Sequence, residues 1–99
     1  MRLTQYQVEN IRRVARRLLG EDVRVTVFGS RALDSKKGGD IDLLFETDAA
    51  LPNRAEALCR LHGALTLALG ERKIDIILKD ASTPAAPVFE IARRTGALL

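Results

Sequence analysis

Three aspartates, Asp40, Asp42 and Asp75, have the type and spacing that could carry chemistry in this sequence. Asp40 and Asp42 lie two positions apart in the apolar segment 40–45, and side chains two apart on a β-strand point to the same face. Asp75 lies inside the segment 73–78, a run of β-branched residues in which an acid is disfavoured. If these two segments are neighbouring strands, the three carboxylates would meet.

Carboxylates gathered on an apolar strand repel one another and lose water, which is costly unless a cation lies between them. Hard oxygen ligands select Mg²⁺, or Mn²⁺ in its place, over zinc. Three acids that bridge two such ions would form a site for phosphoryl or nucleotidyl transfer. The alternative is that all three are surface carboxylates at strand ends.

The pair Gly29-Ser30 could supply the other half of such a site. Glycine lets the backbone approach a phosphate closely, and a short helical turn at 31–33 would offer free N–H groups to it. The Ser30 hydroxyl could donate to the same phosphate, and Arg31, Lys36 and Lys37 could neutralise the charge of a triphosphate. Two alternatives stay open: that Gly29-Ser30 is a plain turn with a helix cap, and that Arg31 forms a structural salt bridge.

The order of the elements predicts how these residues are positioned. Amphipathic spacing predicts a helix over 5–19, capped by Thr4 and ended by Gly20. Alternating and β-branched runs predict strands over 23–28, 40–45 and 73–78, and the second strand would turn Ile41, Leu43 and Phe45 to one face. Further helices are predicted from Pro52 to Leu69 and from Pro84 or Pro87 to Gly96, with a polar loop over 34–39. The predicted fold class is α/β (α+β), a small three-stranded mixed sheet flanked by helices in a single domain, 1–99.

These motifs in this order resemble the DNA polymerase β-like nucleotidyltransferase superfamily, and in particular its stand-alone minimal nucleotidyltransferases. The matching segments are Gly29-Ser30-Arg31-Ala32, Asp40-Ile41-Asp42-Leu43 and Ile74-Asp75-Ile76, and the tail 91–98 is similar to the closing helix of that family. The resemblance implies that Gly29 and Ser30 bind the triphosphate and that the three aspartates bind two Mg²⁺ ions. It also implies that Asp75 is the acid nearest the acceptor.

Minimal nucleotidyltransferases of this size are similar to antitoxins that are paired with HEPN-domain ribonuclease toxins. The resemblance therefore implies transfer of AMP from ATP to a tyrosine of a toxin partner. Two departures concern the loop: Leu33-Asp34 replaces an Arg-Gly that is frequent in the family, and Gly39 replaces a serine. The loop is also about one residue short by comparison with the family. An alternative is a weak or inactive fold that neutralises its partner by binding alone.

Composition limits the number of domains and the cellular location that can be expected. The 99 residues are 46% hydrophobic and 29% charged, which is typical of one globular domain that a partner subunit, or a second copy, would help to stabilise. The N-terminus does not resemble a signal peptide, no apolar run is long enough for a membrane span, and the single Cys59 fits a reducing compartment, so we expect a cytoplasmic protein.

Two other features are weighed against plainer interpretations. The net charge of +3 is uneven, because Arg2, Arg12, Arg13, Arg16 and Arg17 crowd the first 17 residues. Through these arginines, the helix predicted over 5–19 could bind an acidic partner or nucleic acid, although few aromatic residues are available for base stacking. A solvent-exposed charged face is the plainer interpretation. Cys59 and His62 share a helix face, but two ligands are too few for zinc, so we expect packing or solvent exposure.

Overall fold

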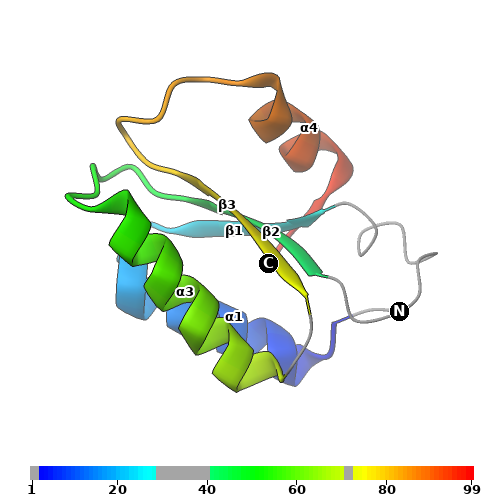
Figure 1. The fold of residues 1–99 in the computed structure, drawn as a ribbon. Helices are drawn as coiled ribbons and strands as arrows, with labels where there is room; N and C mark the ends of the chain where they lie inside the picture. Colours follow the sequence, from blue (N-terminus) through cyan, green and yellow to red (C-terminus); the bar gives the residue numbers. More distant parts are fainter. Residues whose placement is uncertain (1–2, 29–40, 71–72) are drawn as a thin grey trace.

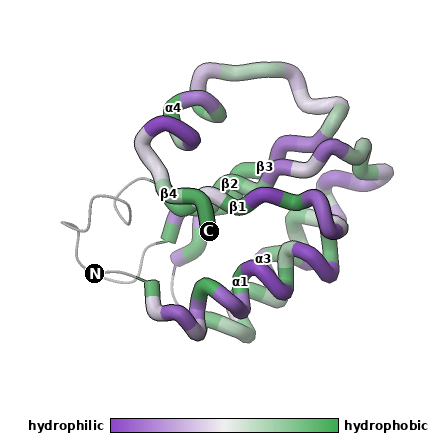
Figure 2. The backbone as a smooth tube through the Cα atoms, turned by 180° about the vertical axis from the view of Figure 1, so that it is seen from behind, coloured by the Kyte–Doolittle hydropathy of each residue, from purple (hydrophilic) through white to green (hydrophobic). Residues whose placement is uncertain are grey.

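The computed structural model describes residues 3–28, 41–70 and 73–99, which form two layers of helix on the two faces of one sheet (Figure 1). In chain order the elements are α1 (Gln5–Leu19), β1 (Arg24–Phe28), β2 (Ile41–Glu46), α3 (Arg54–Leu69), β3 (Ile74–Lys79), α4 (Pro87–Thr95) and β4 (Ala97–Leu98). Helices α1 and α3 lie side by side on one face of the sheet, and α4 lies on the other (Figure 1, and from behind in Figure 2). None of the described helices is long and apolar enough to cross a membrane.

The sheet is mixed and has the strand order β3-β2-β1-β4. β2 pairs with β3 in parallel, whereas β1 pairs with β2 and with β4 in antiparallel fashion. The α+β fold class and the three longer strands are as predicted, each within one residue of its expected bounds. The sheet has one strand more than predicted, because the two residues of β4 are too short to show any alternation in the sequence.

The helices begin and end where local sequence chemistry favours it. The Thr4 hydroxyl accepts from the Gln7 backbone N–H at 3.1 Å, and the Gln7 side chain accepts from the Thr4 N–H at 2.8 Å, a reciprocal capping box. Gly20 and Gly70 end α1 and α3 with positive φ values of 105° and 87°. The predicted start of α3 at Pro52 is wrong: Asn53 is the N-cap, and its side chain accepts from the Glu56 N–H, so the helix begins at Arg54.

The two faces of β2 contribute to two separate cores. Ile41, Leu43 and Phe45 are fully buried against α1 and α3, as their alternation predicted. Leu44 points the other way and packs with Phe89 and Ala92 of α4. The α4 core is small, and this face of the sheet therefore keeps room for polar side chains.

The turn from α4 into β4 depends on Gly96. A side-chain Cβ at this position would lie 2.5 Å from the Val27 carbonyl oxygen and 2.6 Å from that of Ala92. Contacts this close to backbone atoms are not tolerated, so only glycine fits. Gly96 thus lets α4 approach β1, and β4 can then pair with the outer edge of β1.

Candidate active site

Asp42 and Asp75 are brought together by the parallel pairing of β2 with β3. They are direct Cα partners in the register of the two strands. Directly paired residues of adjacent strands project their side chains to the same face of the sheet. The sequence analysis expected a shared acidic site if the third predicted strand lies beside the second, and this condition is met.

The face that carries these acids is the one covered by α4. Asp42, Leu44 and Glu46 alternate with the buried residues of β2, and Leu44 packs against α4. Phe28 is the partner of Asp42 on the other side, so Phe28, Asp42 and Asp75 form one row across three strands. This acid row lies next to the row of Thr26, Leu44 and Ile77, part of which α4 covers.

The acid row lies at the end of the sheet where the segment 29–40, which contains the other predicted site residues, connects β1 to β2. Phe28 is the last described residue of β1, and Gly29 follows it directly in the sequence. Asp40 directly precedes Ile41, whose backbone N–H donates to the Lys73 carbonyl at 3.0 Å. The predicted site residues Gly29, Ser30, Arg31 and Asp40, together with Lys36, Lys37 and the turn at 31–33, lie outside the described residues.

The two described acids differ in exposure. Asp42 is half-buried in the central part of the sheet, whereas Asp75 is exposed because β3 is an edge strand. The desolvation cost expected for Asp75 from its apolar neighbours is therefore small. The part of the sequence argument that the structure supports is that Asp42 and Asp75 lie on adjacent strands and on one face of the sheet.

Divalent metal ions fit the chemistry of this donor set. Two carboxylates on adjacent strands present the hard oxygen atoms that Mg²⁺ and Mn²⁺ prefer. Within the described ranges, no group of three or more His, Cys, Asp or Glu side chains is placed to hold a metal. A third carboxylate would have to come from a position such as Asp40.

A third described acid on the same face, Glu46, is neutralised within the fold. The Arg93 guanidinium of α4 donates through Nε at 2.9 Å and through Nη2 at 2.6 Å to Glu46 Oε2. This hydrogen-bonded contact raises the pKa of Arg93. Glu46 lies at the opposite end of β2 from Asp42, so the pair fixes α4 on the sheet and leaves the acid row uncovered by Arg93.

Asp80 is a fully buried acid that the sequence analysis did not consider, and its partners show a structural role. It accepts from the Leu51 N–H at 2.7 Å, from the N–H and hydroxyl of Ser82, and from the Thr83 hydroxyl. These donors hold the pKa of Asp80 well below its usual range, the Leu51 N–H first among them. The sequence Asp80-Ala-Ser-Thr is typical of a turn in which an aspartate side chain accepts from the residues that follow it.

Cys59 and His62 are solvent-exposed, which is one of the two surroundings that the sequence analysis expected for them. Both are exposed on α3 and line a shallow hollow with Leu58, Gly63 and Ile76. In the part of the chain that the structure describes, no further metal-ligating side chain joins them. The hydroxyls of Ser82 and Thr83, in the turn that follows β3, both donate to Asp80.

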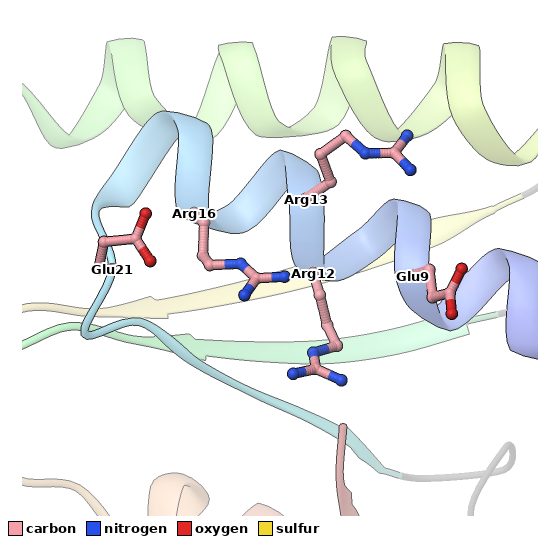
Figure 3. A pocket seen from close by; sticks show the side chains of 5 residues that line it. All are labelled: Glu9, Arg12, Arg13, Arg16 and Glu21. Carbon is pink, nitrogen blue, oxygen red and sulfur yellow. The ribbon is translucent and has the colours of Figure 1, made fainter.

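The basic residues of α1 form an exposed surface in the layer opposite α4. Arg12, Arg13 and Arg16 border a hollow of about 500 Å³, with Glu9 and Glu21 at its two ends (Figure 3). Arg13 donates to the Asn10 side chain, whereas Arg12 and Arg16 form no ion pair with any described residue. These arginines are exposed, and they lie in the layer opposite the face that carries the acid row.

Comparison with known proteins identifies one family. The family model described as "Nucleotidyltransferase domain" matches residues 8–95, a span that runs from α1 to the end of α4. No curated protein matches the chain.

Proposed function

The chain belongs to the nucleotidyltransferase domain family, and we propose that it transfers a nucleoside monophosphate, AMP from ATP, to a hydroxyl group. The pairing of Asp42 with Asp75 in the β2–β3 register is the observation that carries this proposal. It puts two carboxylates on one face at the end of the sheet where the Gly29-Ser30 segment joins β1. Nucleotidyl transfer needs such a combination of acidic metal ligands and a phosphate-binding loop.

In the proposed site each residue has a distinct task. Asp40, Asp42 and Asp75 would hold two Mg²⁺ ions, with Mn²⁺ as a substitute. When bound, these ions would neutralise triphosphate charge and lower the pKa of the acceptor hydroxyl. Gly29 and Ser30 would bind the triphosphate through backbone N–H groups and the serine hydroxyl, and Arg31 would donate to it.

The reaction is a single displacement at the α-phosphorus. The acceptor oxygen forms a bond to this phosphorus while the bond to the oxygen that bridges the α- and β-phosphates breaks, so pyrophosphate leaves with that electron pair. The proton of the acceptor hydroxyl passes to Asp75 or to water. Asp75 suits this role because it is exposed on the edge strand, where an acceptor can reach it.

We further propose that the acceptor is a tyrosine of a HEPN-type toxin and that the protein acts as its antitoxin. The support is the resemblance to minimal nucleotidyltransferases of this size. The exposed edge position of Asp75 adds to it, because a side chain on the surface of another protein can approach an edge strand. A cytoplasmic location follows from the same proposal.

The test is to mix the protein with ATP, Mg²⁺ and the protein encoded by the adjacent reading frame, and to measure the masses of the products. We expect the partner to gain one or more AMP units and pyrophosphate to appear in equal amount. Asp42→Ala should abolish the gain, whereas Asp48→Ala, which removes an exposed acid at the opposite end of β2, should preserve it. No mass gain with the wild-type protein would refute the transfer.

A second candidate function is neutralisation by binding alone, and the arginine surface of α1 favours it. Exposed arginines on a helix can bind an acidic partner without any chemistry. The two functions differ in their dependence on the acids. If a variant with both Asp40→Ala and Asp42→Ala still neutralises the partner, and Arg12→Glu with Arg16→Glu does not, binding alone is sufficient.

A further inference from the structure

Strand β3 has an outer edge with which no strand of the described residues pairs. Its ladder with β2 uses the carbonyls of Lys73 and Lys79, and the peptide groups along a strand alternate between its two edges. The peptide groups of Ile74, Ile76 and Leu78 therefore point to the outer edge. Such an edge can pair with one further strand.

This outer edge is closed at the end remote from the acids. The Arg54 guanidinium of α3 donates to the Leu78 carbonyl, and its Nε lies 3.8 Å from Asp80 Oδ1. Within the described ranges, no contact of this kind reaches the outward peptide groups of Ile74 and Ile76. The open part of the edge is therefore centred on the residue between them, Asp75.

A hollow of about 450 Å³ lies beside this open part, on the face of the sheet that α1 and α3 cover. It is bordered by Ile76 of β3 and by four residues of α3, Leu58, Cys59, His62 and Gly63. No Asp, Glu, Lys or Arg side chain borders it, so the hollow suits an apolar group. Because Ile76 follows Asp75 directly and neighbouring side chains of a strand point to opposite faces, the acid and the hollow lie on the two faces of one edge.

We infer that this edge binds the acceptor protein through an extended segment that pairs with β3, an inference that rests on the proposed function. The residue paired opposite Asp75 projects to the same face as Asp75, which brings its hydroxyl to the acid row. Its two neighbours in the segment point to the other face, where the hollow can receive an apolar side chain. The acceptor is thus a hydroxyl residue with apolar neighbours in an extended segment.

Charge favours such a segment over a second copy of the chain. Two copies joined edge to edge about a two-fold axis would pair their β3 strands in antiparallel fashion. Because the open peptide groups are those of Ile74 and Ile76, the axis would lie at Asp75. The two copies of this acid would then be directly opposite each other, which is destabilising. An uncharged hydroxyl side chain opposite Asp75 does not have this cost.

The test uses two synthetic nine-residue peptides as acceptors, with ATP and Mg²⁺, and measures the transfer of AMP by mass spectrometry. Both peptides have one central tyrosine, which is flanked by leucine in the first and by alanine in the second. We expect kcat/KM to be about fivefold higher for the leucine peptide, because the hollow removes part of a leucine side chain from water.

Filling the hollow should abolish this preference. Cys59 is the single cysteine of the chain and is exposed at the hollow, so N-phenylmaleimide can place a bulky group there. We expect the labelled protein to modify the two peptides equally. Cys59→Ser treated with the same reagent is the matched control and should keep the fivefold preference.

Strand pairing is tested by methylating the backbone amides of the leucine peptide along one edge or along the other. A strand pairs with β3 through only one of its edges. One methylated peptide should therefore lose about tenfold in transfer, whereas the other should be modified like the parent peptide.

Four results would overturn the inference and leave the proposed function in place. They are equal transfer to the leucine and alanine peptides, equal behaviour of the two methylated peptides, transfer to no peptide by a protein that binds ATP with Mg²⁺ in calorimetry, and a dimer in sedimentation that dissociates when Cys59 is labelled. The last result would assign the edge to a second copy. Failure of the wild-type protein to bind ATP with Mg²⁺ would refute the proposed function itself.

Discussion

Asp42 and Asp75 are paired on the same rung of the parallel β2–β3 ladder, one half-buried and one exposed at the sheet edge. Like charges directly opposite each other on adjacent strands destabilise a sheet. A fold that retains this arrangement gains from a ligand that neutralises both charges. In the proposed metal site, this rung would link stability to metal binding, and the link can be measured without any knowledge of the acceptor.

We predict that Mg²⁺ raises the melting temperature of the wild-type protein and that this effect depends on Asp75. At about ten times its Kd, a ligand that binds only the folded state adds about 1.4 kcal/mol to the free energy of unfolding. For a domain of this size that corresponds to a rise of roughly 5–10 °C. Thermal unfolding with and without Mg²⁺ measures the shift.

The control for this measurement is Asp75→Asn, which keeps the shape of the side chain and removes its charge. Without Mg²⁺ the variant should be as stable as the wild type or slightly more stable, since one like charge is gone. With Mg²⁺ its melting temperature should hardly change. If the variant responded to Mg²⁺ as strongly as the wild type, Asp75 would not be a metal ligand.

Much of the fold could be predicted from sequence because its elements have clear periodicity. The alternation of Ile41, Leu43 and Phe45 predicted which face of β2 is buried, and Thr4, Gly20 and Gly96 predicted helix ends. The pairing of Asp42 with Asp75 could be anticipated only as a condition. Strand order and register depend on contacts between distant segments, which periodicity does not encode.

The features that the sequence analysis missed depend on such distant contacts. Glu46 and Arg93 are 47 positions apart, and nothing in either local sequence indicates their pairing. The exposure of Asp75 was misjudged for a similar reason, because apolar neighbours along a strand do not reveal that the strand lies at an edge. Strand β4 forms because Gly96 lets the chain approach β1, a tertiary contact.

The Glu46–Arg93 ion pair should stabilise the packing of α4 on the sheet. Arg93→Gln would leave the carboxylate of Glu46, whose side chain is 8% exposed, without its cationic partner. Since Arg93 itself is 39% exposed and partly screened by water, we expect a loss of about 1–2 kcal/mol in the free energy of unfolding.

A double-mutant cycle measured by chemical denaturation checks this pair. Glu46→Gln combined with Arg93→Gln should cost less than the sum of the two single changes, because the uncompensated buried charge is absent from the double variant. The adjacent Glu90, which accepts from Arg93 on the exposed side of α4, serves as the comparison. Strict additivity of the Glu46 and Arg93 substitutions would contradict the coupling.

Asp80 predicts how stability depends on pH. Its pKa is lower in the folded protein than in the unfolded chain, so the unfolded chain binds the proton more readily. The stability that Asp80 contributes is therefore fully present above the unfolded pKa of about 4, and is lost as the pH falls below it toward the folded pKa. At neutral pH, Asp80→Asn should lower the melting temperature by several degrees, because an amide cannot accept all the donors that now surround the carboxylate.

The comparison that isolates this effect is a pair of pH titrations of the melting temperature. The wild-type protein should lose stability steeply below pH 4, and Asp80→Asn should lose less over the same interval. Ser82→Ala, which removes one hydroxyl donor, should give an intermediate response. Parallel curves for wild type and Asp80→Asn would show that another carboxylate governs the acid transition.

The close approach of α4 to β1 predicts opposite effects for two glycine substitutions. In Gly96→Ala the new methyl group would lie 2.5 Å from the Val27 carbonyl oxygen and 2.6 Å from that of Ala92, and both are backbone atoms that cannot rotate away. The turn into β4 would have to shift, at a cost of about 2 kcal/mol or more in the free energy of unfolding.

Gly63→Ala is the matched control. No atom lies within 4 Å of its new Cβ, and its position inside α3 favours alanine over glycine by up to about 1 kcal/mol. Chemical denaturation of the two variants should therefore move the midpoint down for Gly96→Ala and leave it level or raise it for Gly63→Ala. If Gly96→Ala left the free energy of unfolding unchanged, β4 could separate from β1 without cost. A contact other than this turn would then have to hold α4 on the sheet.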